Sequence, residues 1–66
     1  MNKEELIKDL TQRYESSLLT KRQAAKELQI SPTQVDRLRK DGTLKSTMLG
    51  GLVRIHVSAI ADLMGV

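Results

Sequence analysis

Few side chains in this 66-residue chain have types and spacings that could do chemistry, and those few favour recognition over catalysis. The chain has no cysteine and one histidine, His56. A metal site would need His56 together with scattered carboxylates, and a nucleophile would lack a neighbouring base. We therefore expect no enzyme activity, no metal and no cofactor. Tyr14 is the only aromatic residue, so the stacking platforms that bind single-stranded nucleic acid cannot form.

The polar side chains between residues 32 and 41 recur at helical spacing and suit a DNA duplex. If Val35 and Leu38 face inward, a step of about 100° per residue turns these side chains to the opposite surface. Arginine can grip guanine with two hydrogen bonds, glutamine suits adenine, threonine suits a base or a phosphate, and lysine neutralises phosphate. Amides at the helix N-terminus can also receive a phosphate. The predicted contacts on this helix are Pro32, Thr33, Gln34, Arg37 and Lys40. The alternative is a solvated face on which Asp36 pairs with Lys40.

Basic residues are concentrated in the second part of the chain. Residues 1–19 hold three Lys or Arg against four Asp or Glu, whereas residues 20–66 hold eight against four. This distribution fits a surface that binds a polyanion, although a solvated basic surface fits the charge alone equally well. No apolar run is longer than three residues. We therefore expect neither a membrane span nor a signal peptide, no membrane partner, and a cytoplasmic location.

Two capping boxes predict two short helices joined by a tight turn. A T-x-x-Q pattern at Thr20 opens the first helix, and an S-x-x-Q pattern at Ser31 opens the second, with proline at its first position. Gly42 supplies the left-handed residue that ends the second helix, which therefore runs over about residues 32–41. Two capped helices separated by three residues are typical of a helix-turn-helix.

The apolar spacing of this segment supports the helix-turn-helix interpretation. The motif needs a small residue where the helices cross, and apolar residues ten and thirteen positions later. Ala25, Val35 and Leu38 occupy those places. Gln29 stands where the motif usually has glycine, because the backbone there is left-handed and a side chain costs about 1 kcal/mol.

Residues 44–57 predict a β-hairpin with Gly50 and Gly51 at the centre of its turn. Paired residue numbers then sum to 101. The apolar face holds Leu44, Ser46, Met48, Val53, Ile55 and Val57, and the basic face holds Lys45, Thr47, Leu49, Leu52, Arg54 and His56. A slip of one residue would bury Arg54 and His56, so the pattern and the turn favour one register.

The basic face of the hairpin adds three predicted DNA contacts, Lys45, Thr47 and Arg54, along the backbone or in the minor groove. His56 is interpreted as a surface strand residue, not as a ligand or a switch. Leu49 and Leu52 flank the tip on the same face. They could be a wedge against DNA or a protein contact, or the twist of the hairpin could fold them back onto the body.

The two ends of the chain predict one helix each. From Asn2 to about Ser16 an apolar stripe recurs at helical spacing; it consists of Leu6, Ile7, Leu10 and Tyr14. Asn2 can cap this helix. We favour packing of the stripe onto the rest of the chain over self-association. Ser58 can cap a last helix over about residues 59–64.

A longer pattern carries a resemblance to a known family. The stretch LTKRQAAKEL at residues 19–28 is followed by Ile30-Ser31, Val35, Arg37-Leu38, Gly42, Leu44, Gly51 and Arg54-Ile55. Over about residues 18–64 it resembles the small winged helix-turn-helix group of excisionases and phage regulators, and more distantly the DNA-binding head of MerR-like regulators. The resemblance implies a mainly α fold with one β-hairpin. This winged helix-turn-helix would span residues 18–66, preceded by an extra amphipathic helix over residues 1–17 in a single compact domain.

The resemblance also assigns contacts and functions. By it, recognition-helix contacts fall on Thr33, Gln34 and Arg37, and the wing contact falls on Arg54. Two residues depart from the family pattern: Asp36 stands where an aromatic residue is common, and Arg39 where an apolar residue is common. Members of the group bind duplex DNA as recombination directionality factors that bend an attachment site for an integrase, or as transcriptional regulators of mobile elements.

We therefore expect a sequence-specific double-stranded DNA-binding protein, first of all an excisionase with an integrase as partner. A small transcriptional regulator of a phage or mobile element, acting with RNA polymerase, is the close alternative. A lone module of this size buries only about 600–1,000 Å² on DNA, so several copies are expected on repeated sites. The alternative of a different class is a protein-interaction module or inhibitor that uses Leu49, Leu52 and the N-terminal stripe.

Overall fold

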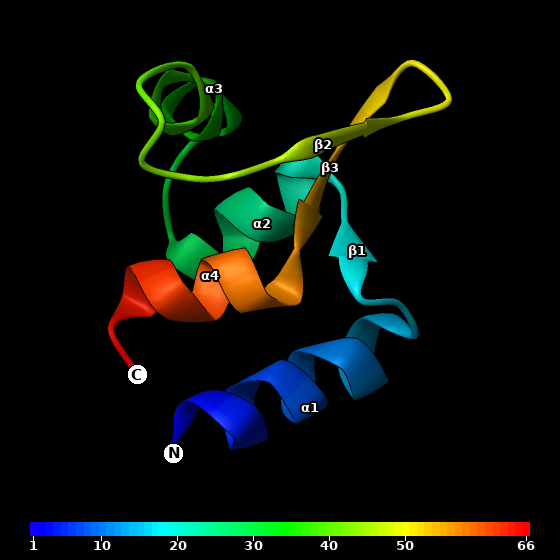
Figure 1. The fold of residues 1–66 in the computed structure, drawn as a ribbon, viewed down its shortest axis with the longest axis vertical. Helices are drawn as coiled ribbons and strands as arrows, with labels where there is room; N and C mark the ends of the chain where they lie inside the picture. Colours follow the sequence, from blue (N-terminus) through cyan, green and yellow to red (C-terminus); the bar gives the residue numbers. More distant parts are fainter.

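The computed structural model describes all 66 residues as four helices and a three-stranded antiparallel sheet (Figure 1). The helices are α1 (Lys3–Tyr14), α2 (Lys21–Leu28), α3 (Pro32–Lys40) and α4 (Val57–Met64). The strands are β1 (Leu18–Leu19), β2 (Thr47–Leu49) and β3 (Leu52–His56), in the sheet order β1-β3-β2. In Figure 1, α1 lies at one end of the molecule, and α3 and the β2–β3 hairpin lie at the other. The prediction of a mainly α winged helix-turn-helix with an additional N-terminal helix is confirmed. None of the helices has the length and apolarity needed to cross a bilayer.

One hydrophobic core joins every helix to the sheet. Its nine buried residues are Leu10, Leu19, Ala24, Ala25, Val35, Leu44, Ile55, Val57 and Ile60. Leu10 of α1 is fully buried, and the rest of the α1 stripe packs against this core. Burying a leucine side chain contributes about 1.5–3 kcal/mol, which is a large share of what a chain of this size can gain. The stripe of α1 therefore packs within its own chain, as the sequence analysis favoured.

Each of the first three helices begins at the predicted capping residue. The Asn2 Oδ1 atom accepts a hydrogen bond from the Glu5 amide at 2.8 Å, and the Asn2 amide donates to the Glu5 carboxylate at 3.3 Å. The same reciprocal arrangement is present at Thr20 and at Ser31. At the turn between α2 and α3, Gln29 is left-handed, with φ of 58°. The backbone required there by the motif is thus present without glycine.

The hairpin has the predicted register but is shorter than expected. Thr47 pairs with Arg54, Met48 with Val53, and Leu49 with Leu52. The predicted pairs closer to the body, those of residues 44–46 with 55–57, are absent from the ladder. The Leu44 amide instead donates to the Leu38 carbonyl at the end of α3, at 3.0 Å, while its side chain enters the core. Residues 44–46 are therefore held beside α3 and not in the sheet.

Two features near β3 were missed by sequence reasoning. Leu18 and Leu19 form a short strand against β3, with Leu18 opposite His56. The predicted cap of α4, Ser58, is wrong, because β3 runs into α4 without a loop and His56 stands at the junction. The His56 Nδ1 atom accepts a hydrogen bond from the Ser58 amide at 3.0 Å, so His56 is the N-cap of α4.

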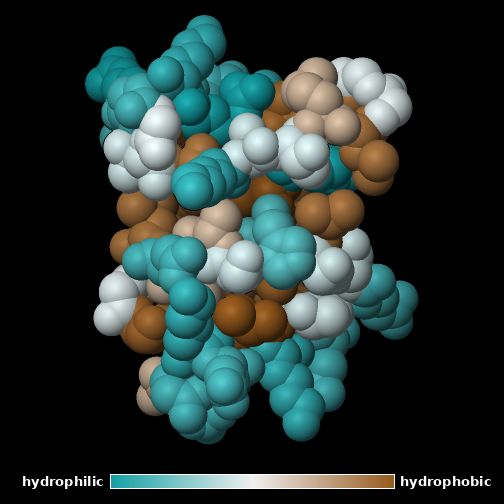
Figure 2. All heavy atoms as spheres, viewed as in Figure 1, coloured by the Kyte–Doolittle hydropathy of each residue, from teal (hydrophilic) through white to brown (hydrophobic).

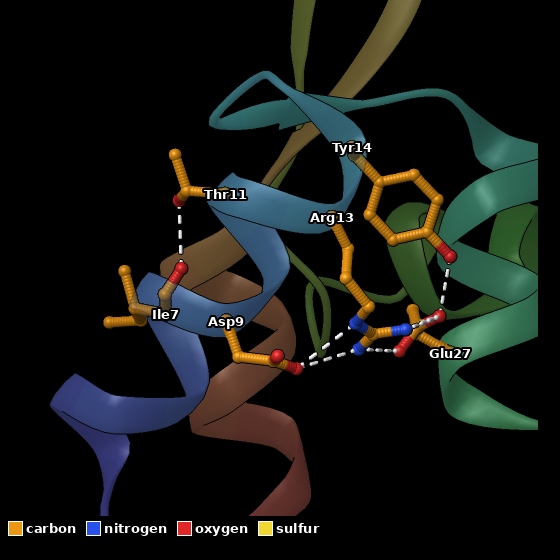
Figure 3. A network of polar contacts seen from close by, with 6 residues as sticks. All are labelled: Ile7, Asp9, Thr11, Arg13, Tyr14 and Glu27. Atoms are coloured by element: carbon orange, nitrogen blue, oxygen red, sulfur yellow. Dashed lines mark hydrogen bonds and ion pairs between the residues drawn. The ribbon is translucent and has the colours of Figure 1, made fainter.

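A polar cluster fastens α1 to α2 (Figure 3). The Arg13 guanidinium donates to both carboxylate oxygens of Glu27, at 2.9 and 3.2 Å, and the Tyr14 hydroxyl donates to the same carboxylate. Asp9 holds the other side of the guanidinium. Hydrogen bonds from Arg13, and then from Tyr14, hold the pKa of Glu27 below its usual value, against the opposing effect of burial. At the other end of α1, Lys3 forms an ion pair with Asp62 of α4.

The Glu27 cluster predicts a pH-dependent stability. A lowered pKa in the folded state means that the ionised Glu27 stabilises the fold above its ordinary pKa of about 4.3. This contribution is lost as the pH falls through the lower folded-state pKa. We expect Glu27→Gln to reduce the free energy of unfolding at neutral pH, and the deficit to shrink below about pH 4. Urea unfolding of both proteins across a pH series measures it.

Glu15→Gln is the matched control for this experiment. Glu15 is exposed and its side chain has no hydrogen-bond or ion-pair partner, so its replacement should leave an almost constant difference across the same pH series. If Glu27→Gln lowered the free energy of unfolding by the same amount at every pH, this result would contradict a stabilising carboxylate at that position.

Candidate nucleic-acid interface

The outer face of α3 is polar and open to solvent. Val35 is fully buried and Leu38 packs against the core, which turns the predicted contacts outward. The exposed residues on this face are Pro32, Thr33, Gln34, Arg37 and Lys40. Figure 2 shows hydrophilic side chains gathered over the end of the molecule where α3 lies. The helical geometry expected from the sequence is therefore present at this face.

The cations on α3 divide into a paired and an unpaired set. Asp36 accepts hydrogen bonds from Lys21 of α2 at 3.1 Å and from Arg39 at 2.9 Å. These partners, Lys21 first, lower the pKa of Asp36. Its carboxylate is therefore ionised at pH 7, and the two neighbouring cations compensate its negative charge. Arg37 and Lys40 have no ion-pair partner. The alternative in which Asp36 pairs with Lys40 is wrong, and two cations on α3 stay available for an anion.

This pairing also explains the two departures from the family pattern. Where the family commonly has an aromatic and an apolar residue, this chain has Asp36 and Arg39. The structure joins them across one turn of the helix, and the Arg39 Nε atom also donates to the Ser46 hydroxyl at 3.1 Å. Lys21 then ties the pair to α2. In this chain, polar contacts of Asp36 and Arg39 thus connect α3 to α2 and to the segment before β2.

A shallow hollow lies along α3. It is lined by Thr33, Asp36, Arg37, Lys40 and Asp41. Asp41 turns its carboxylate to the Thr43 amide at 2.8 Å, and its pKa is lowered by hydrogen bonds from Thr43. Gln34 lies outside this hollow, and its side-chain oxygen accepts a hydrogen bond from the Ser31 amide at 3.4 Å. The amide group of Gln34 therefore helps to cap its own helix, with its NH₂ left free to donate.

A second hollow joins the hairpin to the start of both helices. It is lined by Thr20, Lys21, Arg22, Pro32, Leu52, Val53 and Arg54. Arg54 is half-buried and donates to the neighbouring Val53 carbonyl at 3.4 Å. Arg22 is exposed and has no ion-pair partner. Lys21 and Arg22 are not among the contacts that the sequence predicts, because only the docking of the hairpin brings Arg54 beside them.

The other two predicted contacts of the hairpin lie elsewhere. Lys45 and Thr47 line a third hollow, which they share with Thr43, Ser46, His56, Ser58, Ala59 and Asp62. Thr47 lines this third hollow, although its partner in the ladder, Arg54, lines the second. The eight predicted contacts are thus not gathered at one place. Seven of them line three hollows along α3, beside the starts of α2 and α3, and along α4.

The arrangement defines the class of the protein. Two capped helices, α2 and α3, pack against each other across a three-residue turn, the second presents an open polar face, and a β-hairpin lies beside it. This is a winged helix-turn-helix. The chain belongs to the helix-turn-helix domain family, whose model matches residues 18–65. That family includes excisionase-like small DNA-binding proteins. Neither a curated protein nor a solved structure matches the chain.

Membership of the helix-turn-helix family supports DNA binding. The helix α1 lies outside the residues that the family model matches. The match begins at Leu18, where β1 starts, whereas Leu10 of α1 is as deeply buried as any residue of the matched part. The helix that precedes the family domain is therefore packed on it as a continuous part of its core.

The left-handed turn between α2 and α3 predicts a gain in stability on substitution. Gln29→Gly removes the side chain from a residue with φ of 58°, and we expect the free energy of unfolding to rise by about 0.5–1 kcal/mol. The control is Gln12→Gly, which places glycine in an exposed position of α1 and should cost about 1 kcal/mol. Urea unfolding of the two variants compares the effects, and a loss of stability in both would contradict the strained turn.

Proposed function

We propose that this protein binds double-stranded DNA in a sequence-specific manner, with α3 in the major groove. The observation that carries the proposal is the state of the cations on α3. Arg37 and Lys40 are exposed and unpaired, whereas the neighbouring carboxylate of Asp36 is already neutralised by Lys21 and Arg39. An exposed helix face with free cations and a masked anion is attracted to the phosphate backbone of a duplex.

The residues of α3 divide the work of recognition between bases and backbone. Arg37 lies near the middle of the exposed face and would hydrogen-bond to guanine, with Thr33 and the free NH₂ of Gln34 as further contacts to base edges. Lys40, near the end of the helix, would neutralise a phosphate. Pro32 begins α3, and the Thr33 amide that follows it is left free by the capping box, so it can donate to a phosphate oxygen at the positive end of the helix dipole.

The hairpin would add contacts outside the major groove. Arg54 lies beside Arg22 and Pro32, so the two arginines can hold the backbone strand that borders the groove occupied by α3. Lys45 and Thr47 lie toward α4 and would reach phosphates farther along. Such contacts position the protein on the duplex but distinguish sequences little.

Within this activity, we propose the role of an excisionase of a mobile element that works beside an integrase in the cytoplasm. Binding through a small domain supports it, because a domain with a longest dimension of 28 Å covers less than one turn of DNA, about 34 Å. Several copies on repeated sites would then give the affinity that one copy lacks. A small transcriptional regulator that acts on RNA polymerase uses the same surface and is the alternative.

Replacing the two free cations tests DNA binding. Arg37→Ala should weaken binding to the preferred duplex by about 1–3 kcal/mol and reduce discrimination between sequences. Lys40→Ala should weaken binding to all duplexes alike and lower the slope of log affinity against log salt by about one. Fluorescence anisotropy measures both, with a duplex selected from a random pool and a scrambled duplex, over a salt series.

Lys8→Ala is the control for these variants. Lys8 is an exposed and unpaired cation like Lys40, but it lies on α1 at the opposite end of the molecule, so its loss should change binding little. Salt-insensitive binding that was equal for all three variants would refute the assignment of α3 as the DNA-binding face.

Two assays separate the excisionase from the regulator. For an excisionase, a cognate integrase with its attachment sites should give excision only when the protein is present, and Arg37→Ala should reduce that excision. In parallel, a reporter is placed behind a promoter that contains the selected site. Excision without a change in the reporter supports the excisionase, and the reverse result supports the regulator.

A further inference from the structure

The tip of the hairpin holds three of the six large apolar side chains that the fold leaves exposed. Leu49 and Leu52 are each 57% exposed, and Met48 is 61% exposed. The alternative in which the hairpin twist folds the two leucines back onto the body is therefore wrong. The structure also places Met48 in solvent, although the predicted apolar face would have buried it. Exposed apolar side chains at the end of a projecting hairpin point to something that covers them.

The tip has a narrow shape. Leu49 and Leu52 are direct partners in the ladder, on either side of Gly50 and Gly51. Both glycines have positive φ, and no other part of the chain lies within 4 Å of where a side chain would begin. Two leucine side chains therefore stand side by side at the end of a turn that has no side chains of its own.

Polar groups stand directly behind this apolar pair. Side chains alternate along a strand, so Leu49 and Leu52 share a face with Thr47 and Arg54, which are two residues farther from the tip, or about 7 Å. Met48 lies on the opposite face. Leu52 and Arg54 also line the same hollow as Arg22. The tip is thus continuous with the cationic hollow beside α3.

A duplex groove matches this order of groups better than a protein surface does. In the minor groove, base edges and sugars lie between two rows of phosphates, and an apolar wedge can reach the apolar base faces by opening a step between them. A tip that is apolar in front and cationic behind suits both the opened step and the phosphates. A second copy of this chain fits worse. Residues 20–66 hold eight basic against four acidic residues, so these positively charged regions of two copies would repel each other. The domain is also small enough that the hairpin can reach only a groove next to the one that α3 occupies.

We propose that Leu49 and Leu52 insert together between two base pairs in the minor groove of bound DNA, unstack them and kink the duplex. The inference rests on the proposed DNA binding through α3. Arg54 and Thr47 hold the backbone on either side of the inserted pair. The leucines contribute no sequence-specific hydrogen bonds, so the preferred step would be one that unstacks easily, such as a pyrimidine–purine step.

The test replaces both leucines and reads base stacking directly. The probe is a duplex selected from a random pool by the native protein, with 2-aminopurine substituted for each adenine in turn, because the fluorescence of this base rises when it unstacks. Circularly permuted copies of the same duplex report bending by gel mobility. Both leucines are exposed, so the variant with Leu49→Ser and Leu52→Ser should keep the fold.

The control is Met48→Ser. Met48 is as exposed and apolar as the leucines and lies at the same tip, but on the opposite face of the hairpin. We expect the native protein and Met48→Ser to unstack one step and bend the probe. The double variant should do neither, and its affinity should stay within about tenfold of the native value, because the lost contacts and the avoided unstacking offset each other.

Each contrary result has a distinct meaning. If the native protein binds the probe without a rise in fluorescence at any position, the insertion is overturned and DNA binding stands. If the double variant still unstacks and bends the probe, the leucines are not the inserted groups. If no duplex is retained from the pool, both proposals fail. A concentration-dependent mass that the double variant alone loses would assign the tip to self-association and overturn the insertion.

Discussion

The burial of Val35 against the small residues of α2 is the constraint on which the candidate interface depends. Val35 shares one core with Ala24 and Ala25, and α2 and α3 pack together through it. Because α3 has about 3.6 residues per turn, fixing this one side chain inward fixes Arg37 and Lys40 outward. A larger side chain on α2 would push the helices apart and rotate the polar face of α3 relative to the hairpin. The chemistry of the exposed face is thus decided by the packing of the buried one.

Outside the matched family domain, α1 gives that core a size it would otherwise lack. Small chains bury a low fraction of their surface and are marginally stable. Here α1 adds the buried Leu10, and ion pairs hold its two ends, with Glu27 on α2 and Asp62 on α4. The helix lies far from α3, so it supports the recognition surface without obstructing it.

The features that sequence reasoning found are those set by near neighbours in the chain. Capping boxes act across three residues, which is why the starts of α2 and α3 were predicted at the correct residues. The register of the hairpin follows from Gly50 and Gly51 and from alternation along two strands. The face of α3 likewise follows from its periodicity. What was missed needs contacts between distant segments: a two-residue strand at Leu18, the use of His56 as a cap, and the meeting of Arg54 with Arg22. A strand of two residues leaves no period to detect, and a hollow formed by three elements has no local signal.

The direct passage of β3 into α4 has a mechanical consequence. His56 ends the strand and caps the helix, so no flexible residue lies between the hairpin and the body of the protein. Leu18 and Leu19 of β1 pair with the last two residues of β3, on the edge opposite β2, and hold the base of the hairpin against the core. The base of the hairpin is therefore held rigidly to the body of the protein. A force on the tip of the hairpin would act directly on α4, and through the packing of α4 on α1.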